Sequence, residues 1–170
     1  MEIERKYLFN TIPFDLKQYP CNLIEQVYIS TTPVIRARKK APIDQINGEP
    51  SYILTIKSSG LLKREEYELL LTEDEYHSLL KKAEGNVITK KRYVIPLDSD
   101  LSLELDIFEG AFQGLIMGEI EFPSDEVANK YNPPEYISRE VTFDTHFHNS
   151  TMSHMSESDI SDLIKLAHTN

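Results

Sequence analysis

Charged residues occupy every second position in six short segments of this chain, and Lys57 ends a seventh alternating segment. The first segment opens the chain with Glu2, Glu4 and Lys6. In a β-strand, alternate side chains share one face and lie about 7 Å apart. The pattern therefore predicts seven strands with charge on one face, which either meets solvent or encloses a polar interior, and an apolar layer over the other face of several of them. The further same-face charges are Arg36, Arg38, Lys57, Arg64, Glu66, Glu68, Lys90, Arg92, Glu104, Asp106, Glu119 and Glu121.

These segments also carry recognisable motifs in a fixed order. They read Glu-Ile-Glu-Arg-Lys, Arg-x-Arg, Leu-Thr-Ile-Lys, Arg-Glu-Glu-Tyr-Glu, Lys-x-Arg-Tyr, Glu-Leu-Asp-x-Phe-x-Gly and Glu-Ile-Glu, and run from Glu2 to Glu121. In this order the chain resembles the CYTH superfamily, the triphosphate tunnel metalloenzymes. Glu-Val-Thr near Val141, with Asn149, resembles the closing segment of that family. The resemblance implies an α+β, mainly β fold: a closed antiparallel eight-stranded β-barrel with helices packed outside.

The chain of 170 residues has the length of one domain. We expect a single domain over 1–170, with the barrel over about 1–150. Strands are expected at 2–9, 24–30, 34–40, 51–58, 63–71, 87–96, 101–108, 115–122 and 138–144. Thr72 and Glu75 form a capping-box pattern that predicts a helix to about Ala83, and shorter helices are expected within 12–19 and 124–137. A C-terminal helix at about 156–168 either covers the barrel or mediates a homodimer.

Composition narrows the classes of partner. A net charge of −10 argues against nucleic-acid binding by broad phosphate contact. No apolar run approaches the roughly 20 residues that a membrane span needs, and the charged N-terminus predicts no signal peptide. The single cysteine, Cys21, cannot form an internal disulfide, which agrees with a cytoplasmic protein.

The charge pattern suits a bound polyanion. Arginine matches phosphate oxygens in pairs, and basic side chains from five strands could surround a triphosphate. Carboxylates beside a polyanion would repel it unless a cation stood between them. Mg²⁺ or Mn²⁺ is the natural mediator, because both take oxygen ligands from carboxylates and phosphates.

The resemblance implies a role for each same-face residue. One metal ion would be held by Glu2, Glu4, Glu121 and Glu119, and a second by Glu66, Glu68, Asp106 and Glu104; which carboxylate serves which ion stays open. Lys6 and Tyr28 would act at the reaction site. The phosphate chain would be bound by Lys6, Arg36, Arg38, Lys57, Arg64, Lys90 and Arg92. Lys91 and Glu65 have the opposite parity and should face outward.

The function predicted from this resemblance is hydrolysis of inorganic triphosphate to diphosphate and phosphate. Within the same superfamily, adenylate cyclase and nucleoside or thiamine triphosphatase are alternatives. Outside enzymes, a non-catalytic module that binds triphosphate or polyphosphate would use the same charges, and a structural polar-lined barrel is a third alternative. His146, His148 and His154 are interpreted as part of a polar loop.

Overall fold

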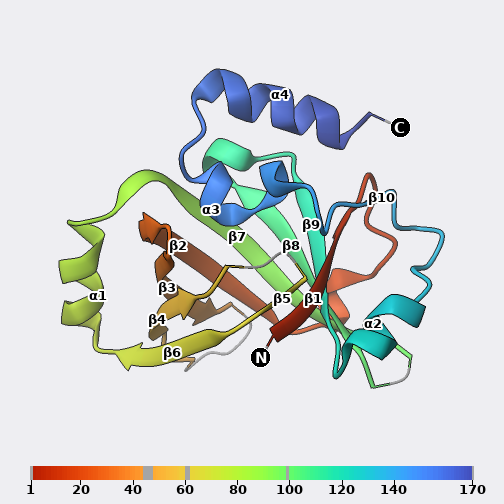
Figure 1. The fold of residues 1–170 in the computed structure, drawn as a ribbon, viewed down its shortest axis with the longest axis horizontal. Coiled ribbons are helices and arrows are strands. Elements are labelled where there is room, and N and C mark those ends of the chain that lie inside the picture. Colours follow the sequence, from red (N-terminus) through yellow and green to blue (C-terminus); the bar gives the residue numbers. More distant parts are fainter. Residues whose placement is uncertain (1, 44–47, 60–61, 99, 170) are drawn as a thin grey trace.

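The computed structural model describes residues 2–43, 48–59, 62–98 and 100–169. Ten strands of the described part form one antiparallel sheet, of which nine follow the order β10-β1-β9-β8-β7-β2-β3-β4-β6, while β5 pairs with β1 off this path (Figure 1). The strands are β1 (Glu2–Leu8), β2 (Cys21–Thr31), β3 (Val34–Pro42), β4 (Ser51–Lys57), β5 (Lys63–Arg64), β6 (Glu66–Leu71), β7 (Glu84–Pro96), β8 (Ser102–Glu109), β9 (Ile116–Glu121) and β10 (Arg139–Glu140).

The closed eight-stranded barrel expected from the resemblance is wrong. The sheet is open: its path ends at β10 on one side and at β6 on the other, and no ladder joins these two strands in the described part of the chain. The edge of β1 is divided between two short ladders, because Glu2 and Ile3 pair with β5 while Tyr7 and Leu8 pair with β10. Among the described residues, β6 is therefore left without a partner strand on its outer edge.

Helices cover parts of both faces of the sheet. They are α1 (Glu73–Leu80), α2 (Asp125–Lys130), α3 (Asn149–Met152) and α4 (Glu157–Ala167), with single 3₁₀ turns at η1 (Leu16–Gln18), η2 (Gly110–Phe112) and η3 (Thr145–Phe147). The Thr72 and Glu75 capping box opens α1 as predicted, and a second box of Ser156 and Asp159 opens α4. None of these helices is long and apolar enough to cross a membrane, as far as the described residues show.

Along several strands, side chains on the concave face change from charged to apolar. Glu104 and Asp106 are followed by Phe108 on β8, and Arg92 and Lys90 lead to Ile88 on β7. Ile88 and Phe108 belong to an apolar cluster with residues of η3, α3 and α4. Thus α3 and α4 cover one end of the concave face, and the C-terminal helix packs on its own chain.

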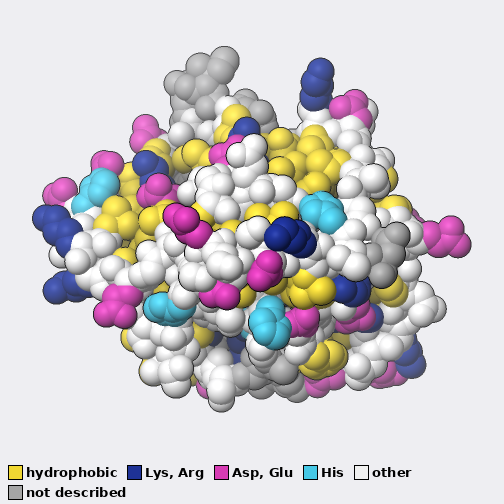
Figure 2. Space-filling view, turned by 90° about the horizontal axis from the view of Figure 1, so that it is seen from above, with side chains coloured by type: hydrophobic (Ala, Val, Ile, Leu, Met, Phe, Trp, Pro, Cys, Tyr) yellow, Lys and Arg dark blue, Asp and Glu magenta, His cyan; other side chains and the backbone are white. Residues whose placement is uncertain are grey.

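The opposite, convex face carries separate apolar clusters. Leu103, Leu105 and Ile120 are buried beneath the segment around η1 and beneath α2. Tyr76 of α1 is fully buried against Tyr52 and Ala37. On the surface seen from the α4 side, acidic and basic side chains lie interspersed (Figure 2). Burial of one face by apolar packing leaves the charged face to the concave side.

Candidate active site

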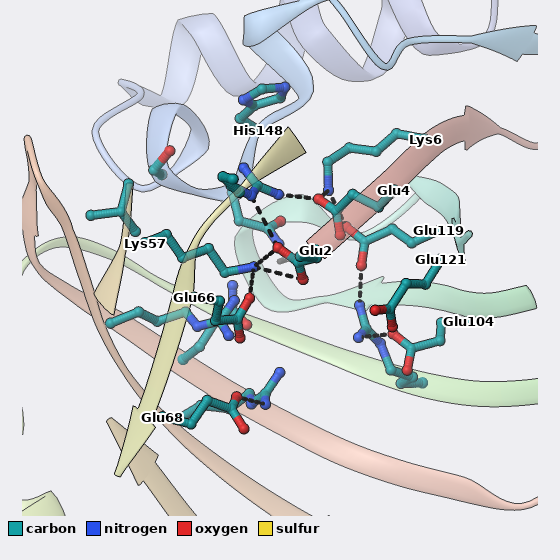
Figure 3. Close-up of a pocket in the computed structure, with 18 of the residues that line it drawn as sticks. Glu2, Glu4, Lys6, Lys57, Glu66, Glu68, Glu104, Glu119, Glu121 and His148 are labelled. Atoms are coloured by element: carbon teal, nitrogen blue, oxygen red, sulfur yellow. Dashed lines mark hydrogen bonds and ion pairs between the residues drawn. The ribbon is translucent and has the colours of Figure 1, made fainter. Parts of the chain in front are cut away.

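A cavity of about 640 Å³ lies on the concave face of the sheet. Its wall includes every site residue predicted from the sequence except Lys90 and Asp106. Carboxylates from β1, β6, β8 and β9 converge on it (Figure 3). The lining residues are Glu2, Glu4, Lys6, Gln26, Tyr28, Val34, Arg36, Arg38, Lys57, Arg64, Glu66, Glu68, Arg92, Asp100, Ser102, Glu104, Glu119, Glu121, Phe122, Pro123, His148, Asn149 and Ser150.

The register of the sheet places opposite charges side by side in this cavity. Lys6 lies opposite Glu119, and Lys57 lies opposite Glu66. Such cross-strand pairs stabilise a sheet, whereas like charges directly opposite one another destabilise it. The same register also sets Glu4 opposite Glu121, which concentrates negative charge at one part of the wall.

Basic side chains neutralise the carboxylates at the β1 end of the cavity. Lys57 Nζ lies 2.8 Å from Glu2 Oε2 and 2.7 Å from Glu66 Oε2. Arg64 Nε lies 3.1 Å from Glu2 Oε2, and its guanidinium also donates to Glu4. A cation or anion that binds here must therefore break some of these ion pairs and take the place of one partner.

Lys6 and Arg92 form a second group of ion pairs. Lys6 Nζ contacts Glu119 and lies 2.9 Å from Glu4 Oε1, while Arg92 Nη2 lies 2.7 Å from Glu119 Oε2. Burial lowers the pKa of Lys6, but the charges of Glu119 and Glu4 outweigh it, so the net pKa is raised. Burial likewise raises the pKa of Glu119, yet Lys6 and Arg92 hold that pKa well below its usual range. Both groups are therefore charged at neutral pH.

Arg36 differs from the other cations of the cavity. Its Nη2 donates to Thr55 Oγ1 at 3.3 Å, its guanidinium also donates to the Tyr28 hydroxyl, and its buried Nε has no hydrogen-bond partner among the described residues. No carboxylate forms an ion pair with Arg36 in the part of the chain that the structure describes. Nearby Arg38 pairs with Glu68 at 3.3 Å, and its pKa falls to about 10 because of burial and the neighbouring Arg36 charge. This part of the wall therefore carries a net positive charge, because Glu68 is the one described carboxylate that pairs with either Arg36 or Arg38.

The acidic part of the wall carries carboxylates that suit a metal ion, but they are not arranged around a common point. Burial and the neighbouring carboxylates of Glu2 and Glu104 raise the pKa of Glu121. A divalent cation would relieve that repulsion, and its preferred ligands are carboxylate oxygens of this kind. No three His, Cys, Asp or Glu side chains stand ready to hold a metal ion, within the ranges that the structure describes. Most of the carboxylates concerned are instead paired with the cations described above.

Tyr28 lies at the apolar boundary of the cavity. Its side chain is buried, and its hydroxyl accepts a hydrogen bond from Gln26 Nε2 at 3.2 Å. Burial raises the pKa of Tyr28, so its hydroxyl stays protonated and can donate a hydrogen bond. Lys91 and Glu65 lie outside the cavity, as their parity predicts; Lys91 instead pairs with Glu109 at 3.0 Å.

Sequence reasoning missed a stretch of the wall. His148, Asn149 and Ser150 line the cavity, although His148 was interpreted as part of a polar loop. Burial and the nearby Lys6 charge lower the pKa of His148, which keeps the imidazole neutral at pH 7. The available signal was the position of His148 next to Asn149 in the closing segment. Alternation in strands could not reveal a site residue that comes from a turn.

Solved structures share this fold and place the chain in a class. The crystal structure of the inorganic triphosphatase NE1496 superposes with a TM-score of 0.65 and 28% identity, covering 92% of this chain and 96% of that one. A Hippeastrum protein whose structure was described with a dominant triphosphatase activity, at 17% identity and a TM-score of 0.53, shares the fold alone over 76% of this chain and 83% of its own. Fold and charged cavity together define a protein of the CYTH class.

Sequence relatives narrow the class to a family. An inorganic triphosphatase of Nitrosomonas europaea is 33% identical over 89% of this chain and 96% of the relative. An inorganic triphosphatase of Acetivibrio thermocellus is 34% identical over 58% of this chain and 63% of the relative. No family model matches the chain. The chain belongs to the inorganic triphosphatase family, whose named members are enzymes that hydrolyse phosphoanhydride bonds.

Proposed function

We propose that this protein hydrolyses inorganic triphosphate to diphosphate and phosphate with the help of Mg²⁺ or Mn²⁺. The observation that carries the proposal is one cavity whose wall holds both Arg36, which has no ion pair to any described carboxylate, and a cluster of glutamates on another part. A triphosphate bound with divalent cations needs both kinds of group at once. The names of the two sequence relatives support the choice of inorganic triphosphate.

The basic side chains of the wall would bind the phosphate chain. Arg36 can do so without breaking an ion pair to any described carboxylate, and Arg38 beside it has a 3.3 Å ion pair with Glu68. Arginine forks bind phosphate oxygens in pairs and so fix direction as well as charge. Lys57 and Arg64 would join them after leaving their present carboxylates, and Arg92 after leaving Glu104 and Glu119.

The carboxylates released in this exchange would hold the divalent cations. Glu2, Glu4, Glu119 and Glu121 surround one part of the wall, and Glu66, Glu68 and Glu104 lie along the other strands of the cavity. A bound Mg²⁺ or Mn²⁺ supplies Lewis-acid stabilisation of the charge that develops on phosphate oxygens. The rest of the catalysis falls to positioning by the protein, since phosphoryl transfer depends mainly on orientation and charge.

Lys6 and Tyr28 would act on the reacting phosphoryl group as hydrogen-bond donors. The raised pKa of Lys6 keeps its ammonium charged, so it suits stabilisation of negative charge better than removal of a proton. The protonated Tyr28 hydroxyl supplies a neutral donor at the apolar end of the cavity. Both groups would stabilise the transition state by fixed electrostatics.

We further propose that residues 1–170 act as one catalytic domain in the cytoplasm. The single cysteine, Cys21, is buried and forms no disulfide among the described residues, which suits a reducing compartment. α4 buries Ile160, Leu163 and Ala167 on its own chain. The apolar face of α4 is therefore not available to a homodimer, which stays a prediction that light scattering of the purified protein can test.

The test is phosphate release from inorganic triphosphate, ATP and thiamine triphosphate, each with Mg²⁺, with Mn²⁺ and with chelator. We expect rapid, metal-dependent release from inorganic triphosphate and slow release from the two substrates that carry an organic group. Formation of cyclic AMP and diphosphate from ATP would favour a cyclase instead. Tight binding of triphosphate without turnover under any metal condition would favour a binding module.

A further inference from the structure

Lys90 and Asp106 form a buried ion pair behind the wall of the cavity. Each side chain belongs to a residue that is only 1% exposed, and neither residue lines the cavity. Lys90 Nζ lies 2.5 Å from Asp106 Oδ2. The motif resemblance had implied phosphate binding by Lys90 and metal binding by Asp106, so their depth calls for a different role.

The Asp106 carboxylate is already occupied by fixed cationic donors. Its Oδ1 accepts from Arg92 Nε at 2.7 Å, and its Oδ2 accepts from Arg92 Nη2 at 2.6 Å as well as from Lys90. Two parallel hydrogen bonds of this kind hold a guanidinium in one plane. A metal ion could reach this carboxylate only by displacing one edge of Arg92 inside the protein, where unpaired charges are costly.

The position of the pair in the sheet explains its burial. Asp106 and Lys90 are the last charged residues on their strands before Phe108 and Ile88 of the apolar cluster. Lys90 Nζ lies 5.3 Å from the centre of the Phe108 ring. Burial lowers the pKa of Lys90 to about 8, only partly offset by the charge of Asp106. The pair therefore forms the boundary between the polar cavity and the apolar end covered by α3 and α4.

We propose that Asp106 and Lys90 are positioning residues, which fix the inner edge of Arg92 and bind neither metal nor phosphate. This inference rests on the proposed function, because it assigns Arg92 to the phosphate chain. Arg92 Nη1 contacts Glu104, and Nη2 also donates to Glu119. When Glu104 and Glu119 bind a cation instead of Arg92, the outer N–H groups of Arg92 become available to phosphate. Asp106 still holds the plane of the Arg92 guanidinium in place.

A metal-binding measurement tests the role of Asp106 without relying on activity. The double variant Lys90→Met/Asp106→Asn removes one positive and one negative charge, so the net charge is unchanged. We expect its dissociation constant for Mn²⁺, measured by calorimetry without substrate, to stay within about threefold of the wild type, while Glu121→Gln weakens binding by about tenfold or more. Equal weakening in the two variants would overturn the proposal.

A kinetic cycle tests the link to Arg92. In the double variant we expect KM for triphosphate to rise about tenfold, because a displaced guanidinium loses its alignment with phosphate. In an Arg92→Met background the same two changes should add less than about a twofold effect, since residues that act through a shared partner are not additive. A full additional loss in that background would show that Lys90 or Asp106 acts on the ligands directly.

A measurement on the unaltered protein covers the case in which the variants do not fold. Carboxyl ¹³C resonances followed during Mg²⁺ addition should shift for Glu121 and stay in place for Asp106. A shift of Asp106 as large as that of Glu121 would refute the positioning role. If the wild type releases no phosphate from triphosphate, the proposed function fails, while the metal titrations still decide whether Asp106 is a ligand.

Discussion

Replacing Arg36 with alanine should separate phosphate binding from folding. In the free protein Arg36 is 8% exposed, donates to Thr55 over 3.3 Å and to the Tyr28 hydroxyl, and pairs with no carboxylate among the described residues. Its removal therefore relieves a buried charge without leaving a charged partner unpaired. With triphosphate bound, two charge-assisted hydrogen bonds of roughly 1.5 kcal/mol each would be lost. The expected loss of kcat/KM is about 150-fold, since 1.4 kcal/mol corresponds to a factor of ten.

Phosphate release and thermal unfolding of the same preparations provide the assay. We expect the melting temperature of Arg36→Ala to equal or exceed that of the wild type. Lys91→Ala is the matched control, because its side chain is 42% exposed and pairs with Glu109 on the outer face of β7; its activity should change less than about twofold. The reasoning is refuted if Arg36→Ala stays active, or if both variants lose activity to the same extent.

Three further changes test the carboxylates and the backbone. Glu121→Gln should raise the melting temperature at pH 7 in chelator and reduce the stabilisation by Mn²⁺, because the pKa of Glu121 is raised in the folded protein and its charge is relieved only as pH falls. Glu119→Gln should lower the free energy of unfolding by about 3 kcal/mol at pH 7. Since the folded pKa of Glu119 is depressed, this difference should shrink in urea titrations from pH 7 to pH 3; a constant difference would contradict the assignment. Gly85→Ala should cost at least about 2 kcal/mol in the same titration, because Gly85 has φ +78° and an added Cβ would stand 2.1 Å from the Ser153 carbonyl oxygen.

Alternation along the sequence predicted the charged face well, because side-chain direction in a strand depends only on residue parity. Lys6, Arg36 and Glu119 line one cavity for this reason. Parity contains no information about depth, so it could not distinguish Arg92 at the wall from Lys90 behind it. Depth depends on where the apolar residues of α3 and α4 meet the sheet, and these come from a distant part of the chain.

Residue parity could not predict whether the sheet closes into a barrel. A pattern of charges fixes which way side chains point but not which strand edges pair. Here the edge of β1 is divided between β5 and β10, each through two residue pairs. His148 was missed because it lies at the start of α3, where no strand period applies.

The ion pairs that fill the cavity have a consequence for how its ligands depend on one another. A polyanion that takes Lys57 or Arg92 leaves carboxylates without partners, and a divalent cation that takes those carboxylates leaves the basic groups without theirs. Either ligand alone bears the whole cost of separating the pairs, whereas the second ligand finds them already separated. Metal and triphosphate should therefore strengthen each other's binding by the same factor, as thermodynamic reciprocity requires. Such a cavity should bind metal and triphosphate tightly when both are present, and either one alone only weakly.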